Sequence, residues 1–218
     1  MDNTIYQKFK EASNKQLTEL KPSDIVFFEN DEIPENYTLV APATEDVLQI
    51  IKDIAQNCPN YTRGQYLYPD REVHLTMLGN IETTTDPEKI MYAVKKVIHC
   101  STLSFRIVGV ASNMNAVSIS CYPQNFDIHA FRHQLRSEIR ESSDDYTIHL
   151  PEYEHMGWVN FMRYLRQPTA SELDEFKLLM HKDFGYFIPA KLQLFKNWSK
   201  VLNKEKRELV GEIALHRL

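Results

Sequence analysis

The chain has 218 residues, 43% of them hydrophobic and 25% charged, and its formal net charge is −5. This length and composition are typical of a globular protein with one large domain or two small lobes. The negative charge argues against a broad basic surface that grips long duplex nucleic acid, but it is compatible with a small basic pocket for a nucleotide or an RNA end.

The cysteines and the N-terminal residues bear on the cellular compartment of the protein. Cys58, Cys100 and Cys121 are widely spaced and form no C-x-x-C pair, which favours reduced thiols over a disulfide framework or a zinc knuckle. The first 20 residues lack the apolar run of a signal peptide, and no segment approaches the roughly 20 apolar residues that span a bilayer. We therefore expect a cytoplasmic protein without a membrane partner.

The first half of the chain alternates between strand and helix patterns. Residues 1–22 have a weak helical period and are expected to form an arm. Thr44 precedes a helix with acidic residues in its first turn, and Asp86 followed by Pro87 is a strong helix start. Strands are expected at 24–29, 37–41, 64–68 and 73–78, with the turn-rich segment 30–36 between the first two.

The second half continues the alternation. Residues 103–110 and 116–122 are expected to form a β-hairpin, followed by a helix at 126–141 and a strand at 158–165. Thr169 and Glu172 have capping-box spacing and begin a further helix. Two strands close the chain, at 191–195 and 208–215. Such an order is typical of antiparallel sheets covered by helices on one side, and two such lobes facing one another would leave a cleft.

The stretch at 73–79 places a histidine and a threonine two residues apart in an apolar strand. Because side chains alternate between the faces of a strand, His74 and Thr76 share one face whereas Leu75 and Met77 take the other. An imidazole beside a hydroxyl suits a phosphate site, where the imidazole moves a proton and the hydroxyl donates to a phosphoryl oxygen. The alternative is a structural histidine in a core strand.

This order, with His74-Leu75-Thr76 on the strand before the Asp86-Pro87 helix, resembles the two-histidine phosphoesterases, which include the 2′–5′ RNA ligase-like proteins and cyclic phosphodiesterases. The resemblance covers about residues 36–216. It implies two pseudo-symmetric lobes around a central cleft, each with a strand that carries His-x-Thr or His-x-Ser. It also implies in-line attack on a 2′,3′-cyclic or 2′–5′ phosphodiester without an obligatory metal or other cofactor, one histidine acting as base and the other as acid.

We therefore expect an α+β fold in two parts. Residues 1–35 would form a helical arm and a first strand. Residues 36–218 would form the two-lobed domain, each lobe an antiparallel sheet with helices on its outer face.

The second motif of the family is not matched in this sequence. Family members often carry an arginine five residues after the second histidine, followed by an aromatic residue. Aligned on Arg163, Trp158 stands at the histidine position and Asn160 at the threonine position; the alternative alignment sets Asn160 and Met162 there. In neither alignment does a histidine occupy the second site. Trp158 can stack on a base and Asn160 can hydrogen-bond a phosphate, so this strand offers binding groups in place of a group that transfers a proton.

Three further residues are candidates for the cleft. Tyr68 would stack on a base and Arg163 would pair with phosphate, although strand alternation places Arg163 opposite Asn160 unless the strand bends. His155, three residues before Trp158, would reach back as a replacement acid. The alternatives are a half-buried strand tyrosine, an exposed arginine and an exposed loop histidine.

No metal is expected. His129 and His133 have the spacing of a metal pair, but the sequence offers neither the glutamate of H-E-x-x-H nor an obvious third ligand. With six glycines and no glycine-rich phosphate loop, a P-loop is excluded.

Three functions remain open. The first is a metal-independent hydrolase of 2′,3′-cyclic or 2′–5′ phosphodiesters that uses His74. The second is a catalytically inactive protein that binds a nucleotide or an RNA terminus, and the third is a scaffold whose cleft holds a protein partner. We expect a monomer in each case.

Overall fold

The computed structural model describes residues 18–27, 32–98, 102–112, 114–139, 155–199 and 204–215, and the single residues Gln7, Glu11 and Lys15. Within these residues the strands form one nine-stranded antiparallel sheet in the order β7-β4-β5-β6-β3-β1-β8-β9, with β2 paired to β6 beside this path. The strands are β1 Glu32–Pro42, β2 Tyr66–Leu67, β3 His74–Glu82, β4 Phe105–Ser112, β5 Ala116–Pro123, β6 Gly157–Arg163, β7 Asp183–Phe187, β8 Lys191–Ser199 and β9 Arg207–Ala214.

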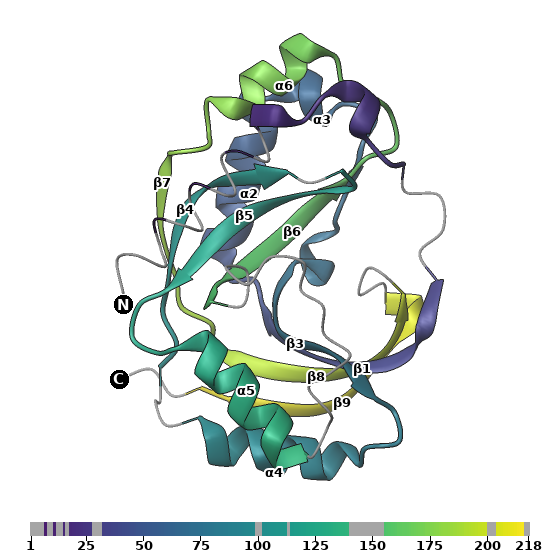
Figure 1. Cartoon of the computed structure of the whole chain (residues 1–218), viewed down its shortest axis with the longest axis vertical. Coiled ribbons are helices and arrows are strands. Elements are labelled where there is room, and N and C mark those ends of the chain that lie inside the picture. Colours follow the sequence, from purple (N-terminus) through teal and green to yellow (C-terminus); the bar gives the residue numbers. More distant parts are fainter. Residues whose placement is uncertain are drawn as a thin grey trace.

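Helices cover the sheet at both of its ends. The α-helices are α2 Glu45–Asn57, α3 Pro59–Thr62, α4 Pro87–Val97, α5 Ile128–Ile139 and α6 Ala170–Lys177, and the short 3₁₀ helices are η1 Pro22–Asp24, η2 Asp70–Glu72 and η5 Lys204–Lys206. Helices α4 and α5 pack on one another, α4 on β9 and α5 on β3, whereas α2, α3 and α6 lie at the other end, near β7 (Figure 1). The expected α+β class with an antiparallel sheet is therefore confirmed.

The strongest local signals in the sequence set the helix starts. The carboxylate of Asp86 accepts a hydrogen bond from the Glu88 N–H at 3.0 Å, and Pro87 is the first residue of α4. Thr169 and Glu172 form the reciprocal capping box at the start of α6. Both predicted starts are confirmed, as is the β4–β5 hairpin.

Other sequence expectations differ from the structure. The strand expected at 24–29 is absent from residues 24–27, where η1 ends and no strand follows; positions 28–29 lie outside the described residues, as does most of the predicted arm. The turn expected at 30–36 is instead, from Glu32 onward, the first part of β1, which has an irregular register on β8 between Glu32 and Asn36. The boundary expected between residues 35 and 36 thus falls within a strand. Strand β7 and helix α3 were not predicted.

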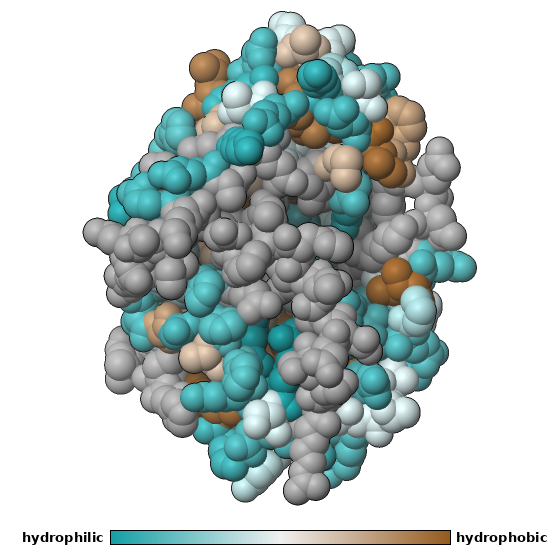
Figure 2. All heavy atoms as spheres, in the orientation of Figure 1, coloured by the Kyte–Doolittle hydropathy of each residue, from teal (hydrophilic) through white to brown (hydrophobic). Residues whose placement is uncertain are grey.

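The face shown in Figure 2 is mostly hydrophilic where residues are described. Hydrophobic side chains gather mainly at the end that carries α3 and α6, and the exposed apolar residues of the described chain include Leu165 and Leu178. No helix of the described residues is long and apolar enough to cross a membrane.

Gly109 and Gly185 form a matched pair for testing a close approach between chain segments. Both have a positive φ, +77° and +94°, but a Cβ at Gly109 would lie 2.1 Å from the Met180 carbonyl oxygen, whereas one at Gly185 would meet nothing within 4 Å. We expect Gly185→Ala to lower the free energy of unfolding by about 1–2 kcal/mol through backbone strain, and Gly109→Ala to lower it by about 1–3 kcal/mol more through the clash. Urea unfolding of the two variants measures the difference, and equal losses would contradict the close approach.

Candidate functional site

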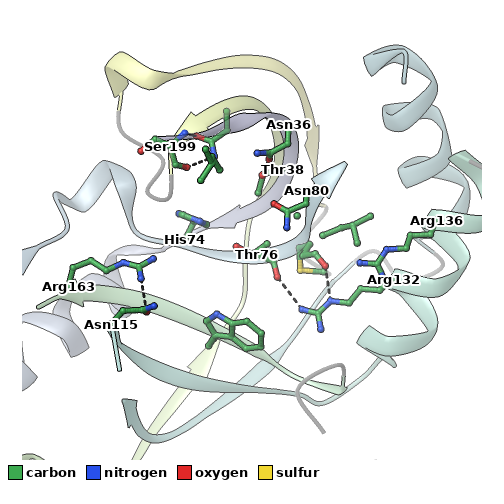
Figure 3. A pocket seen from close by; sticks show the side chains of 16 residues that line it. Asn36, Thr38, His74, Thr76, Asn80, Asn115, Arg132, Arg136, Arg163 and Ser199 are labelled. Carbon is green, nitrogen blue, oxygen red and sulfur yellow. Dashed lines mark hydrogen bonds between the residues drawn. The ribbon is translucent and has the colours of Figure 1, made fainter. Parts of the chain in front are cut away.

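A cavity of about 490 Å³ opens over the inner strands of the sheet (Figure 3). Side chains from β1, β3, β6, β8 and α5 line it. Its charged lining is cationic, because Arg132, Arg136 and Arg163 contribute and the described lining residues include no aspartate or glutamate. A cavity of this size, with several hydrogen-bonding groups, fits a small anionic ligand.

Strand β3 places His74 and Thr76 in this cavity. Both are half-buried, whereas Leu75 and Met77 are fully buried in the core. Met77 nevertheless also contributes to the cavity lining, and its carbonyl oxygen accepts a hydrogen bond from Arg132. The burial of these four residues therefore alternates as expected from the sequence, and the imidazole and the hydroxyl lie together on the cavity side (Figure 3).

The imidazole of His74 is held in one tautomer. Its Nδ1 lies 2.6 Å from the backbone carbonyl oxygen of Glu72, and since a carbonyl oxygen only accepts, Nδ1 must carry the hydrogen. Burial and, to a smaller extent, the charge of Arg207 lower the pKa of His74 to about 4, against the opposing effect of the hydrogen bond to Glu72. The neutral ring therefore presents a lone pair on Nε2, which makes it a proton acceptor at neutral pH.

Strand β6 contributes Trp158 and Arg163 to the same cavity. Their five-residue spacing would place them on opposite faces of a regular strand. Between Asn160 and Met162, however, β6 advances two residues while β5 advances one, so Phe161 is the extra residue of a β-bulge. Phe161 and Met162 are both buried, and Arg163 returns to the cavity side.

The bulge corrects one expectation about this strand. Regular alternation would place Trp158, Asn160, Met162 and Tyr164 on one face. Beyond the bulge, Met162 and Tyr164 are fully buried, and the hydroxyl of Tyr164 hydrogen-bonds that of Ser112 at 2.6 Å.

Arg163 is oriented by two neighbours. Its Nε donates to the hydroxyl of Tyr68 at 2.9 Å, and its Nη1 donates to Oδ1 of Asn115, also at 2.9 Å. Tyr68 is buried, which raises its pKa, while the nearby Arg163 acts in the opposite direction. Tyr68 thus supports the arginine and is not itself among the residues that line the cavity.

Two other candidates lie outside the cavity lining. Asn160 is half-buried, and its Cα pairs with Ser118 on β5. His155 lies with its ring 4.5 Å from the ring of His129 on α5. No group of three or more potential metal ligands occurs among the described residues.

The structure adds Arg132, which was not a candidate from the sequence. Its side chain is 8% exposed and donates three hydrogen bonds to carbonyl oxygens: Nε to Met77 at 2.9 Å, Nη2 to Thr76 at 3.2 Å and Nη1 to Met156 at 3.0 Å. The arginine therefore connects β3 to the residue just before β6. The sequence offered one signal for this residue: Arg132 lies four positions after Ile128, so a charged side chain falls on the buried side of α5.

A group of small polar residues also lines the cavity and was missed. Asn36 and Thr38 belong to β1, and Asn197 and Ser199 belong to β8. All four are buried. Their types occur throughout the chain, so no signal in the sequence distinguished them.

The fold is shared with known structures of low sequence identity. The chain is similar to TT0787 of Thermus thermophilus, with a TM-score of 0.56 and 13% identity over 82% of this chain and 97% of that one. It is also similar to Escherichia coli LigT in the apo form (TM-score 0.52, 11% identity, 87% of this chain and 100% of that one) and with 3′-AMP (0.51, 11%, 85% and 100%). No family model matches the sequence, and no curated protein is similar to it in sequence. At these identities the comparisons show a shared fold, and the resemblance drawn from the sequence is supported at that level.

The protonation of His74 is directly measurable. We expect ¹H–¹⁵N spectra to show a neutral ring with hydrogen on Nδ1 at pH 7 and a midpoint near pH 4. Since the unfolded imidazole has a pKa of about 6.5, the unfolded state binds the proton first as the pH falls. The contribution of His74 to stability should therefore decline between about pH 6.5 and 4, and His74→Gln should remove that part of the pH dependence. A midpoint at or above 6.5 would contradict this environment.

Proposed function

We propose that the cavity binds the phosphate of a nucleotide or an RNA end, and that His74 acts as the base in hydrolysis of a 2′,3′-cyclic or 2′–5′ phosphodiester. The observation that carries this proposal is a neutral histidine, fixed with hydrogen on Nδ1, in a cavity whose charged lining is cationic. The fold supports it further, because LigT, which has the same fold, has been crystallised with 3′-AMP and with ATP.

The pairing of β3 with β6 supports one alignment of the second motif. Leu75 pairs with Val159 in antiparallel register, and an antiparallel pair has a local two-fold axis between its strands. That axis relates His74 to Trp158 and Thr76 to Asn160. We propose that it is also the axis of two pseudo-symmetric lobes, with tryptophan at the position of the second histidine.

Each group has a defined role in the proposed reaction. His74 Nε2 takes the proton of the attacking water as the new P–O bond forms, and the bond from phosphorus to the leaving ribose oxygen breaks. Thr76 donates to a phosphoryl oxygen, and Arg163 compensates the phosphate charge. Trp158 stacks on the base, an interaction of about 1–3 kcal/mol.

The leaving oxygen has no histidine partner in this arrangement. With a pKa of about 4, roughly one His74 ring in a thousand is protonated at pH 7, so this residue is a poor acid. A positioned acid contributes about 10²–10⁴-fold in rate. The reaction is therefore expected to be slow, with the alkoxide protonated from solvent.

Turnover of 2′,3′-cyclic nucleotides and 2′–5′ dinucleotides, followed by chromatography of the products, tests the proposal. We expect slow hydrolysis that falls below detection in His74→Ala because the base is lost. A nucleotide at 100 times its dissociation constant should stabilise the protein by about 2.7 kcal/mol, which is measurable as a rise in melting temperature. His181→Ala, a histidine outside the cavity lining, is the control. Binding without turnover would indicate a nucleotide-binding protein without this activity. The absence of both binding and turnover would refute the proposal.

Restoring the second histidine tests the proposed two-fold relation. The double variant Trp158→His, Asn160→Thr should increase hydrolysis by up to about 10²–10⁴-fold, because it supplies the missing acid. Trp158→Phe is the matched control, since it changes the same aromatic position without adding a titratable group. The relation would be wrong if the double variant kept its fold, still bound nucleotides and gained no activity.

A further inference from the structure

The cavity offers more room than one phosphate needs. Its volume of about 490 Å³ lies in the range of roughly 300–1,000 Å³ typical of sites for drug-sized ligands. A phosphate at His74 and Thr76 would occupy a small part of it. The remaining lining indicates what the rest of the ligand is.

The guanidinium groups of the cavity occupy two separate positions. Arg163 comes from β6, whereas Arg132 and Arg136 come from α5, and His74 and Thr76 lie between these positions (Figure 3). Arg132 is held by the carbonyl oxygens of β3 and of Met156. Arg136 lies one helical turn further along α5, on the same side of the helix.

The lining contributed by β1 and β8 is polar and uncharged. The hydroxyl of Thr38 donates to Oδ1 of Asn36 at 2.9 Å, and Nδ2 of Asn197 donates to the carbonyl oxygen of Ser199 at 2.6 Å. Each of these amides carries two N–H groups and an acceptor oxygen. Nδ2 of Asn36 also donates to the Pro34 carbonyl oxygen, and Oδ1 of Asn197 accepts from the Ser199 N–H, so these bonds orient both amides. The chemistry of such groups matches sugar hydroxyls and the edges of bases.

We propose that the cavity holds an RNA end with two phosphates on one nucleoside. This inference rests on the proposed function, because the first phosphate lies at His74, Thr76 and Arg163. The second phosphate pairs with Arg136, and the nucleoside between them contacts the polar lining of β1 and β8. The ligand class is thus a nucleoside bisphosphate or an oligonucleotide terminus, in preference to a mononucleotide.

Calorimetric titration with adenosine 3′,5′-bisphosphate and with 3′-AMP separates the two classes. Both probes are phosphomonoesters and are outside the proposed hydrolysis. We expect the wild type to bind the bisphosphate at least about ten times more tightly than 3′-AMP, through the additional charged hydrogen bonds. Arg136→Gln should bring this ratio close to one and leave the affinity for 3′-AMP nearly unchanged, whereas Arg136→Lys should retain most of the ratio.

Arg106→Gln is the matched control. It also removes one guanidinium, but Arg106 pairs with Asp183 at 2.6 Å and lies outside the cavity lining. It should leave the ratio at its wild-type value, and thermal unfolding of each variant shows whether the fold is kept.

The outcomes separate the two proposals. A wild-type ratio near one, or a ratio that Arg136→Gln leaves unchanged, would overturn the inference while the proposed function stands. An equal loss of affinity in Arg106→Gln and Arg136→Gln would overturn it too, because net charge alone would then explain the effect. Failure of the wild type to bind either probe would refute the proposed function itself.

Discussion

The contact between the buried Arg132 and three backbone carbonyl oxygens is the interaction on which the site depends. Strand β3 pairs with β6 in register at Leu75 and Val159, and this junction joins the two halves of the sheet. Arg132 donates to two carbonyl groups of β3 and to one just before β6. Hydrogen bonds to charged groups contribute about 1.5–3 kcal/mol each, so a single side chain fixes both strands that carry site residues and also adds positive charge to the cavity.

The parts of the structure that follow from local rules were predicted from the sequence. The alternation of His74 with Leu75, the cap at Asp86 and the capping box at Thr169 each depend on residues a few positions apart. Strand β7 was not predicted because it contains a glycine and begins with a charged residue. It is stabilised by pairing with β4, which is far from it in the sequence. The start of β1 was likewise predicted as a turn from its residue types, because the strand depends on pairing with β8, which is distant in the sequence.

Only part of the cavity lining could be predicted from the sequence. His74 and Thr76 were identified from spacing, but the position of Arg163 depends on a bulge that arises where β6 meets β5. Arg132 lies on the buried stripe of α5, where a helical pattern alone indicates a core position. Which polar residues converge on one cavity is decided by strand order and curvature, and neither is encoded in short spacing.

The environment of His74 and the tryptophan at position 158 both disfavour proton donation to the leaving oxygen of the proposed reaction. Burial keeps the imidazole neutral against the opposing effect of its hydrogen bond to the Glu72 carbonyl, which fixes the tautomer. A neutral ring can accept a proton but cannot serve as the acid. In the proposed reaction, the absence of an acid at Trp158 would raise the barrier by about 3–5 kcal/mol, whereas stacking of a base on the indole would add about 1–3 kcal/mol of binding. Stacking that is equal in the ground and transition states tightens binding without raising the rate constant of the chemical step. Under the proposed function, tryptophan at this position would therefore favour retention of the ligand over fast turnover, and the cationic and amide groups of the lining would act in the same direction.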